Sequence, residues 1–127
     1  MLVDTDILIW YLRGHRRAKN VIDRLPGFSI SAVTYMEIAQ GLRNQQEFRL
    51  WKHFLRERCV QQVPIDQNIS AKAVFWIEEY SLSHHLRMAD VLIAATADVH
   101  GLDLLTGNST DYRFLPGISL KIFKATP

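Results

Sequence analysis

The chain has 127 residues, enough for one domain with a substantial core, and its composition of 48% hydrophobic and 22% charged residues is ordinary for a globular protein. No apolar run approaches the roughly 18–20 residues that cross a bilayer, the start lacks the basic region of a secretory signal, and the single cysteine excludes a disulfide framework. We therefore expect a cytoplasmic protein, and the net charge of +2 excludes nothing by itself.

The first thirteen residues predict a buried strand that turns directly into a helix. Three apolar residues precede Asp4, Thr5 and Asp6, and apolar residues then return at helical spacing. We expect Thr5 to cap the helix and Asp4 to lie at the carboxyl end of the strand, where open α/β sheets bind their ligands. Paired carboxylates beside a core are costly to desolvate unless a cation meets them, but a wet turn for Asp4 and a helix-dipole role for Asp6 remain open.

The rest of the chain alternates helix-like and strand-like segments. Helices are expected at residues 15–25, 31–42, 45–59, 66–80 and 88–100. Strands are expected at residues 28–30, 62–65, 102–106 and 118–123, with a loop or short helical turn at 107–112. Such alternation predicts a mostly parallel sheet with helices on both faces.

Three further carboxylates fall on separate elements near the same predicted rim of the sheet. Glu37 shares a helix side with Thr34 and Gly41, Asp90 has mostly apolar neighbours in the first turn of its helix, and Asp111 follows a strand. Each has a plain alternative: a solvated glutamate, a helix-dipole contact with Arg87 as partner, and ordinary turn chemistry. Their coincidence with Asp4 nevertheless predicts a cluster that needs a countercharge.

A cluster of this kind favours a hard cation such as Mg²⁺ or Mn²⁺, which can activate a water for phosphodiester hydrolysis. With Asp4, Asp6, Glu37, Asp90 and Asp111 set aside, eight of the thirteen acids remain against fifteen Lys and Arg, an excess of +7. A basic surface around an acidic site suits a polyanion, although a solvated surface of mixed charge is the alternative. The candidate RNA contacts are Arg13, Arg16, Arg17, Arg43 and Arg87.

Residues 3–9, 31–37, 89–97 and 105–112 resemble, in order and spacing, the four motifs of PIN-domain ribonucleases, above all the VapC toxins of toxin–antitoxin pairs. The resemblance implies a single PIN domain over residues 1–127, a three-layer α/β/α sandwich with a mostly parallel sheet of about five strands. It also implies Mg²⁺- or Mn²⁺-dependent cleavage of RNA, a homodimer, and inhibition by a cognate VapB-type antitoxin that inserts a segment into the active-site groove.

By the same resemblance the metal-binding and catalytic acids are Asp4, Glu37, Asp90 and Asp111, with a metal-bound water as the nucleophile. The supporting polar residues are Thr5, Asp6, Thr106 and Asn108. Two positions depart from the family pattern: position 6 is more often Asn, and position 107 is commonly Arg where this chain has Gly107.

Other interpretations remain open at this stage. Asp4 and Asp6 after an apolar strand also resemble the opening motif of haloacid-dehalogenase-like phosphatases, in which Asp4 would be the nucleophile, although no downstream Lys is placed for that chemistry. A non-catalytic module that binds RNA or a partner is the second alternative. The adjacent His84 and His85 are expected to be surface or hydrogen-bonded side chains rather than metal ligands.

Overall fold

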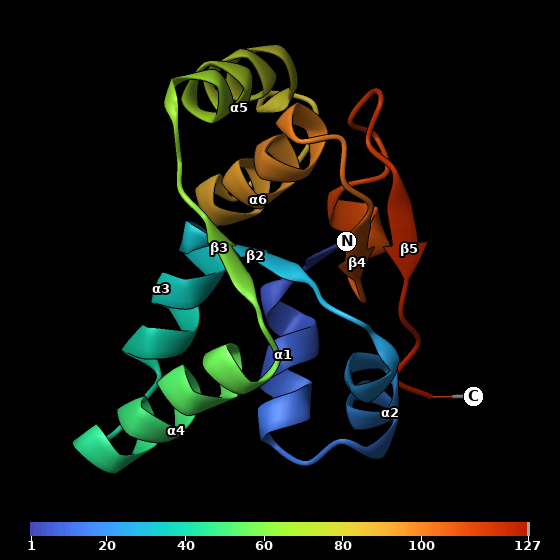
Figure 1. Ribbon diagram of the computed structural model, residues 1–127. Coiled ribbons are helices and arrows are strands. Elements are labelled where there is room, and N and C mark those ends of the chain that lie inside the picture. The colour runs from blue at the N-terminus through green and yellow to red at the C-terminus, as the bar shows by residue number, and fades with distance from the viewer. Residues whose placement is uncertain (127) are drawn as a thin grey trace.

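A fully parallel sheet organises the structure. The computed structural model describes residues 1–126, and within that range the strand order is β3-β2-β1-β4-β5, with every neighbouring pair parallel (Figure 1). The five strands are short: β1 Leu2–Val3, β2 Ser29–Ser31, β3 Gln61–Val63, β4 Leu104–Thr106 and β5 Leu120–Ile122. The predicted parallel sheet is confirmed.

Helices cover both faces of this sheet. They are α1 Thr5–Leu12, α2 Arg16–Arg24, α3 Ala32–Gln40, α4 Gln45–Glu57, α5 Gln67–Tyr80 and α6 Met88–Val99, with a 3-10 turn, η1, at Ser109–Asp111. In Figure 1, α5 and α6 lie together at one end of the view, and α1, α2 and α4 lie at the other. Among residues 1–126, no helix combines the length and apolar character that crossing a membrane requires.

Side-chain caps set where most of the helices begin. Ser31 accepts a hydrogen bond from the Val33 amide and so starts α3, and Asn44 and Asp66 cap α4 and α5 in the same way. The expectation that Thr5 caps α1 is wrong. The cap is Asp4, whose carboxylate accepts from the Thr5 amide, while the Thr5 hydroxyl bonds to other side chains.

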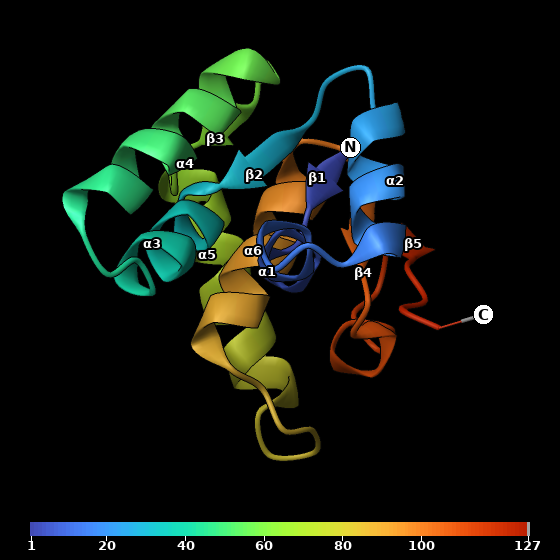
Figure 2. The same ribbon diagram turned by 90° about the horizontal axis from the view of Figure 1, so that it is seen from below.

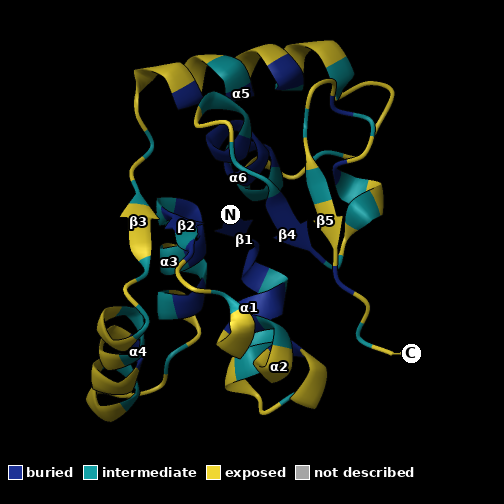
Figure 3. Cartoon of the chain, turned by 45° about the vertical axis from the view of Figure 1, so that its right-hand side comes forward, coloured by how far each residue is buried: buried dark blue, intermediate teal, exposed yellow. Residues whose placement is uncertain are grey.

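The core is divided by the sheet into two apolar clusters, and the alternation of strand side chains creates the division. Leu2 of β1 packs among α5 and α6 with Trp76, whereas Val3 packs on the opposite face among α1 and α2 with Trp51. Figure 3 shows the three central strands β1, β2 and β4 and much of α6 buried, whereas the edge strands β3 and β5 and the outer helix α4 are largely exposed. The central strand β1 therefore contributes to both clusters, and the chain immediately after it lies where they meet.

Candidate active site

The predicted acids lie on four elements whose ends meet at the carboxyl edge of the sheet. Asp4 follows β1, Glu37 lies in α3, Asp90 lies in the first turn of α6, and Asp111 ends η1 beyond β4. Figure 2 looks along α1 and shows α3 on one side of it and α2 on the other. Because the strands are all parallel, the segments that follow them emerge on one rim.

Asp4 is the most enclosed of these acids. Its residue is only 3% exposed, and Oδ2 accepts hydrogen bonds from the Thr106 hydroxyl (2.7 Å) and the Tyr112 hydroxyl (3.0 Å). Burial, reinforced by the charge of Asp6, raises the pKa of Asp4 from 3.8 to about 6, and the hydrogen bonds only partly oppose that rise. An ionised Asp4 at neutral pH is thus costly without further positive charge.

Asp90, in the first turn of α6, interacts electrostatically with Asp4 and the other acids of the rim. Burial raises the pKa of Asp90 from 3.8 to about 6, and the charges of Asp4, Asp111 and Glu37 add to the rise, while Arg87 opposes it. These contributions indicate that the three other carboxylates lie close enough to Asp90 for their charges to act on it. Arg87 precedes α6 and forms no side-chain cap there.

Tyr112 links the first and third motifs, and the sequence analysis missed it. The residue is fully buried, and its hydroxyl lies 3.0 Å from Oδ2 of Asp4 and 3.4 Å from Oδ1 of Asp90. Burial and the neighbouring acids raise the pKa of Tyr112, so the phenol stays protonated and available as a donor. The only sequence signal was an aromatic residue with a hydroxyl directly after Asp111.

Glu37 is held by a hydroxyl group from another helix. The Thr5 hydroxyl at the start of α1 donates to Oε1 of Glu37 (2.8 Å) and lies 3.0 Å from the hydroxyl of the buried Thr34. Glu37 itself is half-buried, so one carboxylate oxygen is fixed against Thr5 while the side chain keeps access to solvent. The structure thus places Thr5 between two of the candidate acids.

The two departures from the family pattern contact each other. The amide of Gly107 donates to Oδ2 of Asp6 (3.0 Å), while Oδ1 of Asp6 is buried and finds no hydrogen-bond partner within residues 1–126. A Cβ atom on Gly107 would lie 2.8 Å from Oδ2 of Asp6 and 3.1 Å from the Trp10 ring. A side chain at position 107 therefore conflicts with the present positions of Asp6 and Trp10.

The remaining predicted residues divide into those at the rim and those outside it. Thr106 connects to Asp4 and also accepts from the Asn108 amide (3.0 Å), so Asn108 contributes its backbone. Arg43 pairs with Glu47 rather than with an acid of the rim. His84 stacks on Phe114 with ring centroids 3.9 Å apart, and His85 is exposed.

Arg13 and Arg43 line a groove that also contains Glu37, while Arg16 and Arg17 are exposed on α2. The assignment of RNA contacts to these arginines stays a prediction.

The donor set suits a hard cation held loosely by protein. Within residues 1–126, no three Asp, Glu, His or Cys side chains come close enough to enclose a metal ion by themselves. Carboxylate oxygens of Asp4 and Asp90, with the unpartnered Oδ1 of Asp6 nearby, offer an all-oxygen surface of raised proton affinity. Such a surface fits Mg²⁺ or Mn²⁺, ions that commonly keep several waters in protein sites.

Comparison with known proteins identifies the family. Residues 1–114 match the sequence profile of the PIN domain. Ribonuclease VapC10 of Mycobacterium tuberculosis is 38% identical over 112 residues, which cover 85% of this chain and 82% of that protein. A chain of a toxin–antitoxin complex from Klebsiella pneumoniae is 31% identical with a TM-score of 0.73, and the match covers 92% of this chain and 93% of that one.

A second solved structure supports the fold alone. A chain of VapBC2 from Rickettsia felis, bound to a DNA fragment from its promoter, has a TM-score of 0.83 at 16% identity, covering 97% of this chain and 98% of that one. The resemblance drawn from the four motifs is confirmed: the chain belongs to the PIN-domain family, in its VapC branch.

Proposed function

We propose that the protein is a metal-dependent endoribonuclease, the toxin of a VapBC-type pair. The observation that carries the proposal is the meeting of Asp4 and Asp90, joined through the Tyr112 hydroxyl, at a rim that also holds Glu37 and Asp111. The similar VapC10 is named a ribonuclease. Family membership also removes the haloacid-dehalogenase alternative.

The acids have separate tasks in this proposal. Asp4, Asp90, Asp111 and Glu37 would hold Mg²⁺ or Mn²⁺, in part through water molecules that the ion keeps, and the ion would lower the pKa of a water and stabilise charge on the phosphate. Tyr112 and Thr106 fix the orientation of the Asp4 carboxylate through Oδ2.

On the other side of the rim, Thr5 fixes one oxygen of Glu37 and leaves the rest of that carboxylate to face the substrate or its water. Asp6, fixed by the Gly107 amide, adds negative charge beside Asp4 and so raises the affinity of the rim for a cation.

Cleavage of RNA by the purified protein, freed of antitoxin, tests the proposal. With Mg²⁺ or Mn²⁺ we expect cutting of single-stranded RNA that EDTA abolishes, and a loss of at least about a hundredfold in Asp4→Ala and Asp90→Ala, because each removes a ligand of the ion. Glu79→Gln, which changes an exposed acid of α5, is the matched control.

Unchanged cleavage by both aspartate variants would refute the site assignment. RNA binding without any metal-dependent cleavage would instead support the non-catalytic alternative.

A groove between α1, α3 and α4 supports the antitoxin part of the proposal. It has a volume of about 640 Å³ and reaches from Glu37 past the exposed side chains of Leu12 and Leu50, which are 45% and 62% exposed. An apolar segment of an antitoxin would bury those side chains while its end covers the acids. We expect Leu50→Glu to prevent co-purification with the cognate antitoxin while RNA cleavage persists.

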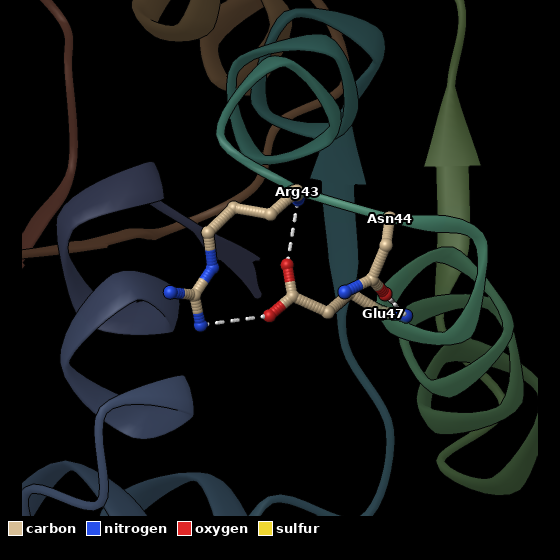
Figure 4. Close-up of polar contacts among 3 residues, drawn as sticks. All are labelled: Arg43, Asn44 and Glu47. Atoms are coloured by element: carbon tan, nitrogen blue, oxygen red, sulfur yellow. Dashed lines mark hydrogen bonds and ion pairs between the residues drawn. The ribbon is translucent and has the colours of Figure 1, made fainter.

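Figure 4 shows the side chains at the far end of this groove. Arg43 donates to Glu47 from both its amide (2.6 Å) and its guanidinium (3.1 Å), and Asn44 accepts from the Glu47 amide. This cluster fixes the turn that leads from α3 into α4. The turn lies between two helices that line the groove.

We also propose that residues 1–127 form a single PIN domain. We propose further that the toxin is a homodimer located in the cytoplasm. Mass measurement by light scattering, with and without antitoxin, tests the dimer.

A further inference from the structure

A second hollow lies on the other side of the rim from the groove just described, between α2 and the end of β5. Its volume is about 410 Å³, and its polar lining consists of Arg17, Arg24, Lys124 and Asn20. Among residues 1–126 no acidic side chain lines it, and the rest of its lining is apolar. We call it the α2–β5 pocket. Three cationic groups around an apolar floor form a site complementary to an anion with an apolar portion.

The cations of the α2–β5 pocket are gathered without counter-ions. The ion pairs of residues 1–126 involve Arg43, His53, Arg58 and Lys72, and none uses a cation of this pocket. Arg17 instead donates to the main-chain carbonyl of Lys124 (3.3 Å), which joins α2 to the chain after β5. The three cations of the pocket are therefore available to an anion.

The side chain of Trp10 lies between the pocket and the part of the rim that contains Asp6. Trp10 packs against Phe123, with ring centroids 5.4 Å apart, and Phe123 lines the pocket. The Trp10 ring also lies close to Gly107, whose amide donates to Asp6. Because β5 is parallel to β1 and β4, Lys124 emerges at the same edge of the sheet as Asp4. A chain molecule with repeated negative charges can therefore touch the acids and the pocket at once.

We propose that the α2–β5 pocket is a phosphate-binding subsite for the RNA strand, holding a phosphodiester away from the bond that is cut. The inference rests on the proposed nuclease function and assigns part of its substrate binding. Arg24 and Lys124 contact the phosphate, and the apolar floor at Val21 and Ile122 receives the adjoining ribose or base. Trp10 separates that nucleotide from the reacting one.

Binding of a fluorescein-labelled single-stranded RNA, measured by anisotropy in EDTA so that no cleavage occurs, tests the subsite. The double variant Arg24→Gln/Lys124→Gln is expected to bind roughly tenfold more weakly at low salt. The slope of log K against log salt should fall by about 1.4, from two lost phosphate contacts on a single strand. Both side chains are exposed, so the fold is retained, which circular dichroism checks.

The matched control is Lys52→Gln/Arg56→Gln, which removes the same charge from a different hollow on α4. Equal weakening by the control would show a general charge effect and overturn the subsite, as would unchanged binding by the Arg24 and Lys124 variant or no RNA binding by the unmodified protein. The two proposals fail separately. Binding that depends on the pocket without metal-dependent cleavage would refute the nuclease alone, and cleavage with unchanged binding by the variant would refute the subsite alone.

Discussion

Tyr112 shows how one hydroxyl decides the geometry between two motifs. It carries a single proton, yet it lies within hydrogen-bond reach of two carboxylates, that of Asp4 after β1 and that of Asp90 in α6. The proton can be donated to only one of them at a time, and Asp4 is the nearer. Tyr112 therefore stabilises the ionised form of Asp4, and its oxygen lies between the carboxylates of Asp4 and Asp90.

Replacing Tyr112 by Phe tests this role. We expect Tyr112→Phe to lower the free energy of unfolding by about 1–2 kcal/mol at pH 8 in EDTA, because a hydrogen bond to a charged group is lost. The loss should be smaller at pH 4.5, where the acids are protonated. Urea unfolding measures both values. Tyr35→Phe is the control, since Tyr35 packs on Trp51 and its hydroxyl has no recorded partner within residues 1–126. Equal losses at both pH values would contradict the role.

Gly107 is constrained by contact rather than by backbone conformation. A Cβ atom there would meet Oδ2 of Asp6 at 2.8 Å, and the Trp10 ring stands close on the other side. We expect Gly107→Ala to destabilise the protein by about 1–3 kcal/mol, since overpacking forces one of these side chains to shift. Thermal unfolding measures the effect. Gly27→Ala is the control, because a Cβ atom there meets nothing within 4 Å. Equal melting temperatures for the two variants would contradict the contact.

At the scale of whole elements, the sequence marks clearly where helices and strands begin and end. Each helix and strand boundary lies within two residues of the position expected from sequence, because caps such as Ser31 and Asp66 and the glycine after α3 mark the ends locally. The cap of α1 was misassigned for a non-local reason. Thr5 has the right chemistry for a cap, but its hydroxyl is used by Glu37, which lies 32 residues away.

The start of α4 gives a prediction at this scale. Asn44 accepts from the Glu47 amide (2.9 Å), and Glu47 reaches back to the Arg43 amide, so each end of the turn supports the other. We expect Asn44→Ala to cost about 1 kcal/mol of the free energy of unfolding. Gln46→Ala, an exposed neighbour in the first turn, should cost almost nothing. Chemical denaturation of both variants provides the comparison, and a cost shared by the two would argue against the cap.

For the molecule as a whole, the acidic rim makes stability depend on pH in an unusual direction. The pKa values of Asp4 and Asp90 in the folded protein are about 6 against an ordinary 3.8, so between these values the folded state binds more protons than the unfolded state. Stability therefore falls as pH rises from about 4 to about 7. For the buried Asp4 alone the loss is on the order of 3 kcal/mol.

The corresponding measurement is the melting temperature in EDTA at pH 5 and pH 8. We expect a lower value at pH 8, restored by millimolar Mg²⁺ or Mn²⁺, whose charge offsets the ionised acids, and a smaller effect of these ions at pH 5. Asp4→Asn should flatten the pH dependence. A melting temperature that is the same at both pH values, or ions that stabilise equally at both, would show that the rim does not bind the cation as proposed.

The convergence of the four acids was predictable because it follows from topology: parallel strands deliver the residues after them to one edge. The partners of those acids were not. The approach of Tyr112 to Asp90 (3.4 Å) and the bond from the Gly107 amide to Asp6 (3.0 Å) depend on how the folded chain packs, which no spacing pattern encodes. The α2–β5 pocket likewise joins Arg17 and Lys124, which are 107 residues apart.

The division of the interior into two clusters has a practical consequence for following this molecule optically. Of the three indole side chains, Trp76 belongs to the cluster under α5 and α6, Trp51 belongs to the opposite cluster, and Trp10 packs against that opposite cluster beside Gly107. Variants of this protein that keep only one tryptophan would report by fluorescence on the surroundings of that tryptophan alone. Coincident emission changes during unfolding would show that both clusters unfold as one unit. A shift confined to Trp10 on adding RNA would show that RNA binds near Gly107.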